Sequence, residues 1–317
     1  MILCCGEALI DMVPFTTGEG GAFRPCPGGS PYNSAVAVGR LGVPVGFVGR
    51  LSTDFFGDIL VDRLKANGVR TDYIVRADQT STLAFVRLEK GKEPEYAFYT
   101  EGSADRSFRQ EDLPAKLPDE ARCILFGSIS LTMEPIASTI EAFVRREASS
   151  RVTSFDPNIR PVMIHDRAAY VKRLESLMAC ATIVKISGAD MDFVYPGLDR
   201  ESAMKRVMAF GPSLVVTTLG ADGALAIGKR KDGKEFRATA PIVDVKVVDT
   251  IGAGDTFHAG FLSWLEMNGK MSREKIASLS EAELSAALFF ANKAASLVCS
   301  KRGAEPPTMA EMDALKA

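Results

Sequence analysis

Short apolar runs alternate with amphipathic segments along most of this chain. The runs are rich in β-branched residues, whereas the segments between them repeat apolar positions at helical spacing. The runs predict strands at Ile2–Cys5, Val45–Val48, Ile124–Phe126, Val152–Phe155, Ile183–Ile186, Leu214–Thr218 and Ala224–Ile227. The segments predict helices at Asn33–Leu41, Phe56–Asn67, Glu134–Glu147, Arg167–Met178 and Ser202–Phe210. Such alternation is typical of an α/β fold in which helices cover both faces of a parallel sheet.

Two segments break this alternation. Residues 12–30 are rich in Gly, Pro and Thr, and residues 81–104 contain the period-2 runs Leu83–Leu88 and Tyr96–Tyr99, joined by Glu89–Lys92. Period-2 runs around a short glycine-containing connection predict a hairpin. We predict that both segments form one small β-sheet lid, and a pair of edge strands on the main sheet is the alternative. The main domain would then comprise residues 1–11, 31–80 and 105–317.

The bulk composition excludes several classes of function. The 317 residues are 46% hydrophobic and 25% charged, which matches an ordinary globular protein. A net charge of −2 with no basic stripe argues against a nucleic-acid partner. The apolar start at Met1–Cys5 is interpreted as a buried strand and not as a signal peptide, and no run of about 18 apolar residues predicts a membrane span. We therefore expect a cytoplasmic protein.

Cysteine and histidine usage argues against metal and disulfide frameworks. The six cysteines show no C-x-x-C spacing, so we expect them to be reduced. The two histidines, His165 and His258, are too far apart for metalloprotease zinc spacing, and G-x-S-x-G is absent.

The segment Asp249–Gly260 carries the strongest chemical signal. Gly252, Ala253 and Gly254 have little or no side chain, so their amides can approach a bulky anion. The helix that follows adds unpaired N–H groups and partial positive charge at its start. Asp255 in the first turn of this helix could act as a base. The glycine turn, the helix start and Asp255 together predict a phosphoryl-transfer site with an alcohol as acceptor. The alternative role for Asp255 is a helix cap, but capping does not require two flanking glycines.

A second glycine turn, Gly28–Ala35, also leads into a predicted helix. Gly28 and Gly29 permit close approach of a ligand, and the Asn33 amide offers both a donor and an acceptor. By itself this turn fits ordinary turn chemistry equally well.

Two other nucleotide-binding classes are excluded by their motifs. G-x-x-x-x-G-K-[ST] is absent, so the chain is not a P-loop enzyme. The third small residue of a dinucleotide-binding fingerprint is replaced by Phe257, which lowers the case for an oxidoreductase.

Together the two glycine turns resemble the paired signatures of the ribokinase-like (PfkB) carbohydrate kinase family. The signatures are Gly28–Asn33 and Asp249–Asp255, and further matches occur in the family's order over nearly the whole chain, at Asp11, Thr218–Gly223 and Ala291–Asn292. The resemblance implies the ribokinase-like three-layer fold with a small β-sheet lid. It also implies transfer of the γ-phosphoryl group of ATP to a sugar, with Asp255 as the base and the amides of Ala253, Gly254 and Asp255 on the phosphoryl group.

The resemblance assigns further residues to ligands. Asp11, Gly28, Gly29 and Asn33 would bind the sugar. A second set would face the nucleotide: Lys185, Ser187, Thr218, Gly220, Gly223, Ala291 and Asn292. Asp190, one methylene shorter than the glutamate of the family motif, would order Mg²⁺ through water. Asp249 and the carbonyl of Ile251, with the region around Gly303 opposite, would hold a monovalent cation such as K⁺.

The identity of the sugar is predicted from the segment Asp156–Arg160, which resembles that of fructokinases and of 2-keto-3-deoxygluconate kinases. The keto-acid kinases place an arginine in a Tyr-Tyr-Arg stretch, whereas this chain has Phe98-Tyr99-Thr100. Loss of a charge-assisted pair favours a neutral sugar. The segment Gly102–Arg106 looks like that of bacterial fructokinases, so Phe98, Arg106 and Arg160 are also assigned to the substrate.

These observations lead to one expected activity and several open alternatives. We expect ATP-dependent phosphorylation of D-fructose to fructose 6-phosphate. Alternatives within the family are a 2-keto-3-deoxygluconate kinase and a nucleoside or riboside kinase, and an alternative outside enzymes is a sugar-binding regulator on the same fold. Apolar faces on the lid strands would need cover, so we expect a homodimer that pairs its lids.

Overall fold

A mixed ten-stranded sheet forms the centre of the molecule. The computed structural model describes residues 1–18, 20–87, 95–230 and 232–315. The strand order is β14-β13-β12-β11-β10-β9-β1-β4-β5, with β6 paired to β4. The parallel strands are β1 (Ile2–Cys5), β4 (Val45–Ser52), β5 (Val69–Arg70), β6 (Ile74–Ala77), β9 (Cys123–Gly127), β10 (Val152–Asp156), β11 (Ile183–Lys185) and β12 (Leu214–Thr218). β13 (Ala224–Lys229) and β14 (Glu235–Ala240) continue the sheet in the antiparallel sense.

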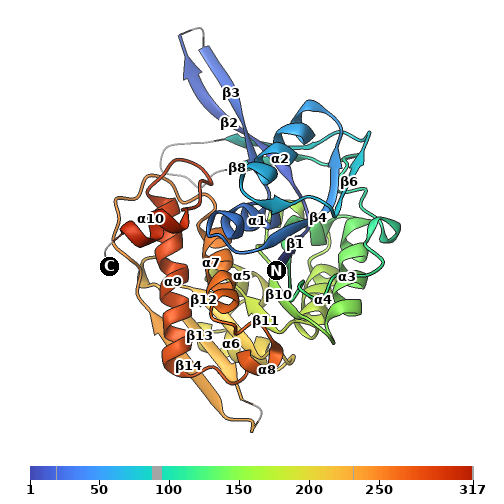
Figure 1. Ribbon diagram of the computed structural model, residues 1–317. Coiled ribbons are helices and arrows are strands. Elements are labelled where there is room, and N and C mark those ends of the chain that lie inside the picture. The colour runs from blue at the N-terminus through green and yellow to red at the C-terminus, as the bar shows by residue number, and fades with distance from the viewer. Residues whose placement is uncertain (19, 88–94, 231, 316–317) are drawn as a thin grey trace.

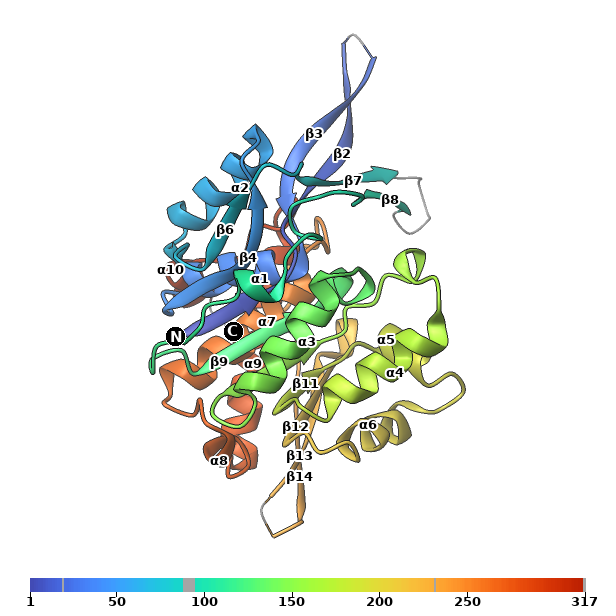
Figure 2. The same ribbon diagram turned by 90° about the vertical axis from the view of Figure 1, so that its right-hand side faces the viewer.

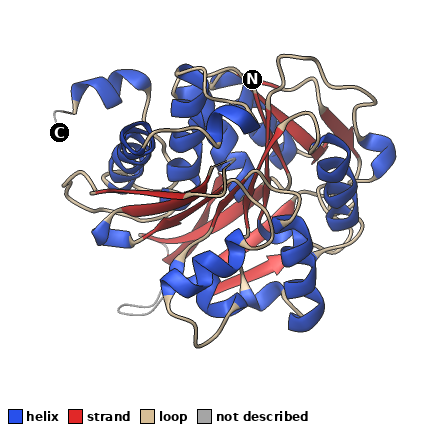
Figure 3. Ribbon diagram, turned by 90° about the horizontal axis from the view of Figure 1, so that it is seen from below, coloured by secondary structure: helices blue, strands red, loops and turns tan. Residues whose placement is uncertain are grey.

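Helices cover both faces of this sheet (Figure 3). One face carries α1 (Ser30–Arg40), α2 (Phe55–Ala66), α7 (Ala253–Met267) and α9 (Glu281–Cys299). The other face carries α3 (Ile136–Glu147), α4 (Arg167–Met178), α5 (Gly188–Val194) and α6 (Arg200–Met208). Two short helices, α8 (Arg273–Ile276) and α10 (Met309–Ala314), lie before and after α9 in the chain. Earlier in the chain, 3₁₀ turns occur at Gln110–Asp112, Ser128–Thr132, Pro161–Met163 and Gly220–Asp222.

Strand β1 is apolar at every position and does not alternate between apolar and polar residues. Ile2 and Cys4 belong to the core under α1 and α7, whereas Leu3 and Cys5 belong to the core under α3 and α4. All of these side chains are fully buried, because a strand in the middle of a covered sheet has no solvent face. The α/β fold with a mostly parallel sheet covered on both faces is therefore confirmed.

A second sheet of four strands projects from the body, as Figures 1 and 2 show. Its order is β3-β2-β7-β8, formed by β3 (Gly20–Gly28), β2 (Leu9–Thr17), β7 (Thr82–Arg87) and β8 (Glu95–Tyr99). In the described residues these strands pair only with one another, and not as edge strands of the main sheet. The predicted connection Glu89–Lys92 lies outside the described residues.

Helix α9 is long and apolar enough to cross a membrane by length and composition alone. It has 19 residues and a mean hydropathy of 1.2. It packs against α7 and against β13 and β14, and the side chain of Asn292 is buried within it. A core helix passes the same test, so this resemblance to a membrane span is weak evidence.

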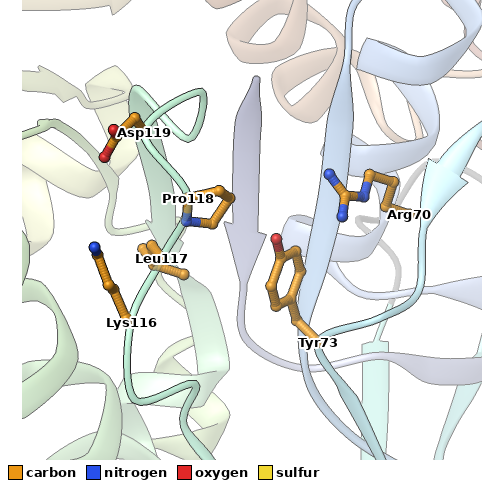
Figure 4. Close-up of a pocket in the computed structure, with 6 residues that line it drawn as sticks. All are labelled: Arg70, Tyr73, Lys116, Leu117, Pro118 and Asp119. Carbon is orange, nitrogen blue, oxygen red and sulfur yellow. The ribbon is translucent and has the colours of Figure 1, made fainter.

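The two edges of the parallel sheet differ in their chemistry. A pocket of about 430 Å³ lies beside β5 and the segment that leads into β9, at the amino-terminal edge of the strands (Figure 4). It is lined by Arg70, Tyr73, Lys116, Leu117, Pro118 and Asp119. Ligands of α/β sheets bind at the carboxyl edge instead. Polar side chains from several elements are buried together at that opposite edge.

Candidate active site

The glycine turn that the sequence predicts to bind an anion lies at the N-terminus of α7. Gly252 caps the helix at φ 75°, a left-handed conformation that favours glycine. A Cβ on Gly252 would lie 2.9 Å from the Cβ of Ala304. The N–H of Ala253 donates to the carbonyl of Thr250 at 3.2 Å, and the amides of Gly254 and Asp255 belong to a first turn that has no intrahelical acceptors.

The Asp255 carboxylate is held by side chains from two other elements. Its Oδ1 accepts a hydrogen bond from Ser30 Oγ at 2.6 Å, and its Oδ2 accepts one from Asn33 Nδ2 at 2.9 Å. Asn158 Nδ2 lies 3.4 Å from Oδ1. Burial raises the pKa of Asp255, and the hydrogen bonds from Ser30 and Asn33 act in the opposite direction. The arrangement orients a buried carboxylate from both sides.

Ser30 and Asn33 reach Asp255 because α1 starts at the end of the small sheet. Strand β3 ends at Gly28, and Gly29 caps α1 with φ 103°. A Cβ on Gly29 would lie 2.9 Å from the carbonyl oxygen of Glu7. Pro31 occupies the first turn, where its missing N–H costs no helical hydrogen bond. Both glycines of this turn therefore have structural reasons in addition to their predicted role in substrate binding.

Glu7 is a functional candidate that sequence reasoning missed. Its side chain is 1% exposed, and its Oε1 accepts the N–H of Ser30 at 3.1 Å. Its Oε2 accepts the N–H of Ser130 at 3.2 Å and a short hydrogen bond from the same residue's hydroxyl. Burial raises the pKa of Glu7, and the serine hydrogen bonds lower it. The available signal was a glutamate placed directly after an apolar strand.

Asp11 and Gly28 meet where β2 and β3 pair. A Cβ on Gly28 would lie 2.2 Å from Oδ2 of Asp11, so only glycine leaves room for this carboxylate. Burial raises the pKa of Asp11 to about 7, the charge of Arg160 lowers it, and that of Asp255 raises it. Asp11, Arg160 and Asp255 therefore lie within electrostatic range of one another.

Asn158 connects the predicted sugar-binding arginine to the predicted base. Arg160 Nη1 donates to Asn158 Oδ1 at 2.7 Å, while the amide nitrogen of the same Asn158 faces Asp255. Asn158 has a positive φ of 38°, which turns the chain sharply after β10. Asn158 belongs to the sequence segment Asp156–Arg160, but its contact with Asp255 could not be predicted from the sequence.

A buried ion pair lies beneath the start of α7. Lys185 Nζ is 2.8 Å from Asp156 Oδ2, and the two side chains are 6% and 3% exposed. Burial alone would lower the pKa of Lys185, but the charges of Asp156, Asp190 and Asp255 raise it, so the ammonium stays charged. A Cβ on Gly254 would lie 3.2 Å from Nζ. The Lys185 ammonium, paired with Asp156, therefore lies directly against the first turn of α7.

His258, one turn after Asp255, is buried beside this pair. Its Nε2 is 2.6 Å from Ser154 Oγ, and its Nδ1 is 3.8 Å from Asp156 Oδ2. Burial lowers the pKa of His258 to about 3, so the ring is neutral at physiological pH. No sequence motif pointed to this histidine.

Two predicted substrate residues lie at the lid and beside it. Phe98 is partly buried on β8 and stacks on Tyr96, with ring centroids 5.8 Å apart. Arg106 forms an ion pair with Glu101 and donates to the carbonyl of Glu134 at 3.3 Å. The roles of Phe98 and Arg106 in substrate binding stay predictions.

Two of the predicted nucleotide residues, Gly223 and Asn292, meet at the end of β14. Gly223 has φ 90°, and a Cβ there would lie 2.1 Å from the carbonyl oxygen of Ala240. Asn292 Nδ2 donates to the carbonyls of Ala240 and Pro241, each at 2.9 Å. Thr218 ends β12, Gly220 starts the following 3₁₀ turn with φ 60°, and Ala291 is fully buried on α9. Gly223 and Asn292 therefore both contact the backbone at Ala240, whereas the nucleotide roles of Thr218, Gly220 and Ala291 stay predictions.

The predicted metal ligands have protein partners of their own. Asp190 and Ser187 form a capping box at the start of α5, and Asp190 Oδ1 also accepts the N–H of Ile159 at 2.8 Å. Asp249 accepts the N–H of Ile251 at 3.0 Å and that of Gly303 at 2.9 Å. Within the described ranges no group of three or more His, Cys, Asp or Glu side chains could hold a metal ion.

Comparison with known proteins decides the family. The family model described as pfkB family carbohydrate kinase matches residues 1–311. The chain belongs to this family. It is also 44% identical over 286 residues to a fructokinase of Rhizobium leguminosarum bv. trifolii, which covers 90% of this chain and 85% of that protein. The resemblance drawn from the two glycine turns is thus confirmed, and the chain is a carbohydrate kinase.

Solved structures of related kinases share the whole fold. A fructokinase from Xylella fastidiosa with bound ATP superposes with a TM-score of 0.88 at 31% identity, over 98% of this chain and 96% of that one. A fructokinase from Vibrio cholerae O395 with fructose, ADP and calcium ion bound gives a TM-score of 0.84 at 26% identity, over 99% and 97% of the two chains.

Proposed function

We propose that this carbohydrate kinase transfers the γ-phosphoryl group of ATP to D-fructose and releases fructose 6-phosphate and ADP. The observation that carries the proposal is the buried Asp255 carboxylate at the start of α7, oriented by Ser30 and Asn33. The similarity to fructokinases, among them structures with ATP and with fructose bound, supports both substrates.

The proposed chemistry uses Asp255 as the base. Ionised Asp255 accepts the proton of the sugar hydroxyl while that oxygen forms a bond to the γ-phosphorus and the bond to the β-phosphate oxygen breaks. First-turn amides of α7 donate to the phosphoryl oxygens, and the Lys185 ammonium beneath them offsets their negative charge. The proton leaves Asp255 for solvent after the products separate.

The binding residues in the proposal are those that the family resemblance assigns. Asp11, Asn33 and Arg160 would bind sugar hydroxyls, and Phe98 would cover the sugar from the lid. The nucleotide would lie along the turn of Gly220 and Gly223 toward Asn292. The remaining binding residues in the proposal are Gly28, Gly29, Arg106, Ser187, Thr218 and Ala291.

Ions complete the proposed site. Both oxygens of Asp190 already accept protein hydrogen bonds, so this carboxylate fits a contact to the waters of Mg²⁺ better than a direct ligand. Mg²⁺ bound with ATP would offset phosphate charge. Asp249 and Ile251 would hold K⁺, and unchanged turnover with sodium in place of potassium would remove that part of the proposal.

The oligomeric state and compartment are also part of the proposal. Phe15 and Phe23 are 43% and 47% exposed on the small sheet, so a lid-paired homodimer in the cytoplasm would cover them. A monomeric mass by light scattering would contradict the dimer.

A coupled ADP-release assay tests the activity. D-fructose, other neutral sugars, 2-keto-3-deoxygluconate and ribosides are compared at equal concentration, and fructose is expected to give the highest kcat/KM. Asp255→Asn should lower kcat by about 10³-fold because the general base is lost. Asp192→Asn, which changes an exposed aspartate on α5, serves as the matched control. Folding of each variant is confirmed by circular dichroism, and a folded Asp255→Asn variant with full turnover contradicts the mechanism.

A further inference from the structure

The hydroxyl of Ser30 makes the shortest side-chain hydrogen bond to the Asp255 carboxylate in the described part of the chain. It lies 2.6 Å from Oδ1, compared with 2.9 Å for Asn33 and 3.4 Å for Asn158. A serine hydroxyl has a single proton, and an ionised carboxylate can only accept. The distance falls in the range of charge-assisted hydrogen bonds, which are stronger than neutral ones.

The position of Ser30 is fixed independently of Asp255. Its N–H donates to buried Glu7 at 3.1 Å, and Ser130 holds the other oxygen of that carboxylate. Gly29 before it lies close to the backbone of residue 7. Ser30 itself is only 9% exposed, so solvent competes little for its proton. The hydroxyl is therefore presented to Asp255 by a rigid first turn.

A second serine on α1 differs from Ser30 because it does not contact the Asp255 carboxylate. Ser34 lies one turn later on the same helix and is 1% exposed. Its hydroxyl approaches the main-chain carbonyl of Asp255, at 3.4 Å, and not the carboxylate. The two serines thus share a helix and a burial class but differ in whether they contact the reacting group.

We propose that Ser30 is a positioning residue that holds Asp255 toward the sugar hydroxyl and keeps it in the ionised form that accepts a proton. The inference rests on the proposed function, because it requires Asp255 to be the base. Without the Ser30 proton, Oδ1 would keep only the long contact to Asn158, and the carboxylate would be held closely through Oδ2 alone, by Asn33.

The surroundings of Asp255 give the direction in which its pKa should change when the Ser30 hydroxyl is removed. Burial raises the pKa of Asp255 and so favours its protonated, inactive form, while the Ser30 hydrogen bond lowers the pKa and favours the ionised form. Removing the hydroxyl should therefore shift the acidic limb of activity toward higher pH. The other ionisable groups that act on Asp255 or lie beside its contacts are Glu7, Asp11, Asp156, Arg160, Lys185, Asp190 and His258. Substitution of Ser30 changes none of them.

The test is the pH dependence of kcat/KM for the sugar, from pH 5 to pH 9, in Ser30→Ala, Ser30→Thr and Ser34→Ala. Ser30→Ala should move the acidic midpoint upward by about one pH unit, as loss of a charge-assisted hydrogen bond of about 1.5 kcal/mol requires. At pH values below the wild-type midpoint this variant should turn over about tenfold more slowly than wild type, and the difference should disappear well above the midpoint. Ser30→Thr keeps the hydroxyl and should restore the wild-type midpoint, and Ser34→Ala should leave it unchanged.

The outcomes distinguish failure of the Ser30 proposal from failure of the proposed function, in which Asp255 is the base. An unchanged midpoint in folded Ser30→Ala, or a rate loss that is equal at every pH, overturns the role of Ser30. A Ser30→Thr profile that matches Ser30→Ala overturns it as well, because the hydroxyl would not be the cause. Asp255→Asn is measured in parallel: if it stays active, the base assignment fails and not merely the part played by Ser30.

Discussion

Replacement of Asp11 by asparagine should stabilise the protein, and more so as the pH rises. Burial raises the pKa of Asp11 from 3.8 to about 7, so the folded state binds this proton more tightly than the unfolded chain. The resulting stability is fully present below pH 3.8 and is lost as the pH rises through 7. The amide side chain of the Asp11→Asn variant has no such proton, so its contribution does not change over this range.

The magnitude follows from the two pKa values. Between pH 5 and pH 8, a shift of this size removes about 2.5 kcal/mol of the free energy of unfolding. Because Asp11 keeps some contact with solvent, this is an upper bound. The difference in stability between Asp11→Asn and wild type should therefore grow by up to about 2.5 kcal/mol over the interval.

Urea unfolding at pH 5 and pH 8 measures this difference. Asp62→Asn replaces an exposed aspartate on α2 and controls for the general effect of removing a negative charge. Because Asp11 is proposed to bind the sugar, Asp11→Asn should at the same time raise the KM for the sugar, so that the variant gains stability and loses function. If Asp11→Asn and wild type differ equally at both pH values, burial does not disfavour the Asp11 anion and the reasoning is wrong.

Two further substitutions test close packing and buried charge. Gly28→Ala should displace the Asp11 carboxylate by about 1 Å and lower kcat/KM for the sugar by about 10²-fold, with Gly21→Ala on open space of the same strand as the control. Equal kinetics for the two alanine variants would refute this. Lys185→Met should lower the free energy of unfolding by about 3–5 kcal/mol, since Asp156 would be buried without a counter-charge. Adding Asp156→Asn should recover part of that loss, and no recovery would mean that the ion pair is not its origin.

The main sheet was largely predictable because its strands are apolar on both faces. The predicted strand Leu214–Thr218 matches β12 in both bounds, and the predicted helix Arg167–Met178 matches α4. Strand β14 was missed because its buried positions include the small residues Ala238 and Ala240, which give a weak alternation signal. Helix α9 was not predicted as an element of its own, although a late helix was expected around Asn292.

Helix α1 shows how a boundary can be missed. Apolar periodicity placed its start at Asn33, whereas the helix begins at Ser30. Proline in the sequence suggested a turn, but proline is accepted in the first turn of a helix. The left-handed Gly29 that caps the helix is visible only in the structure.

The reactive groups of the site were predictable from local motifs, whereas their contacts were not. Asp255 follows a glycine turn and can be recognised from its own neighbours. The contacts from Ser30 and Asn158 join residues 225 and 97 positions apart, and Glu7 acts from a third segment. Such contacts depend on which strand ends are adjacent in the sheet, and no periodicity in the sequence reports that order.

One residue joins the small sheet to α1, the helix whose Ser30 and Asn33 contact Asp255. Strand β3 ends at Gly28 and α1 begins at Ser30, so Gly29 is the whole connection between them. Rotation of the small sheet must either be absorbed by the two backbone torsions of Gly29 or move the Ser30 hydroxyl. The Gly29 torsions therefore determine how far a change in the orientation of the small sheet reaches the hydroxyl that contacts Asp255.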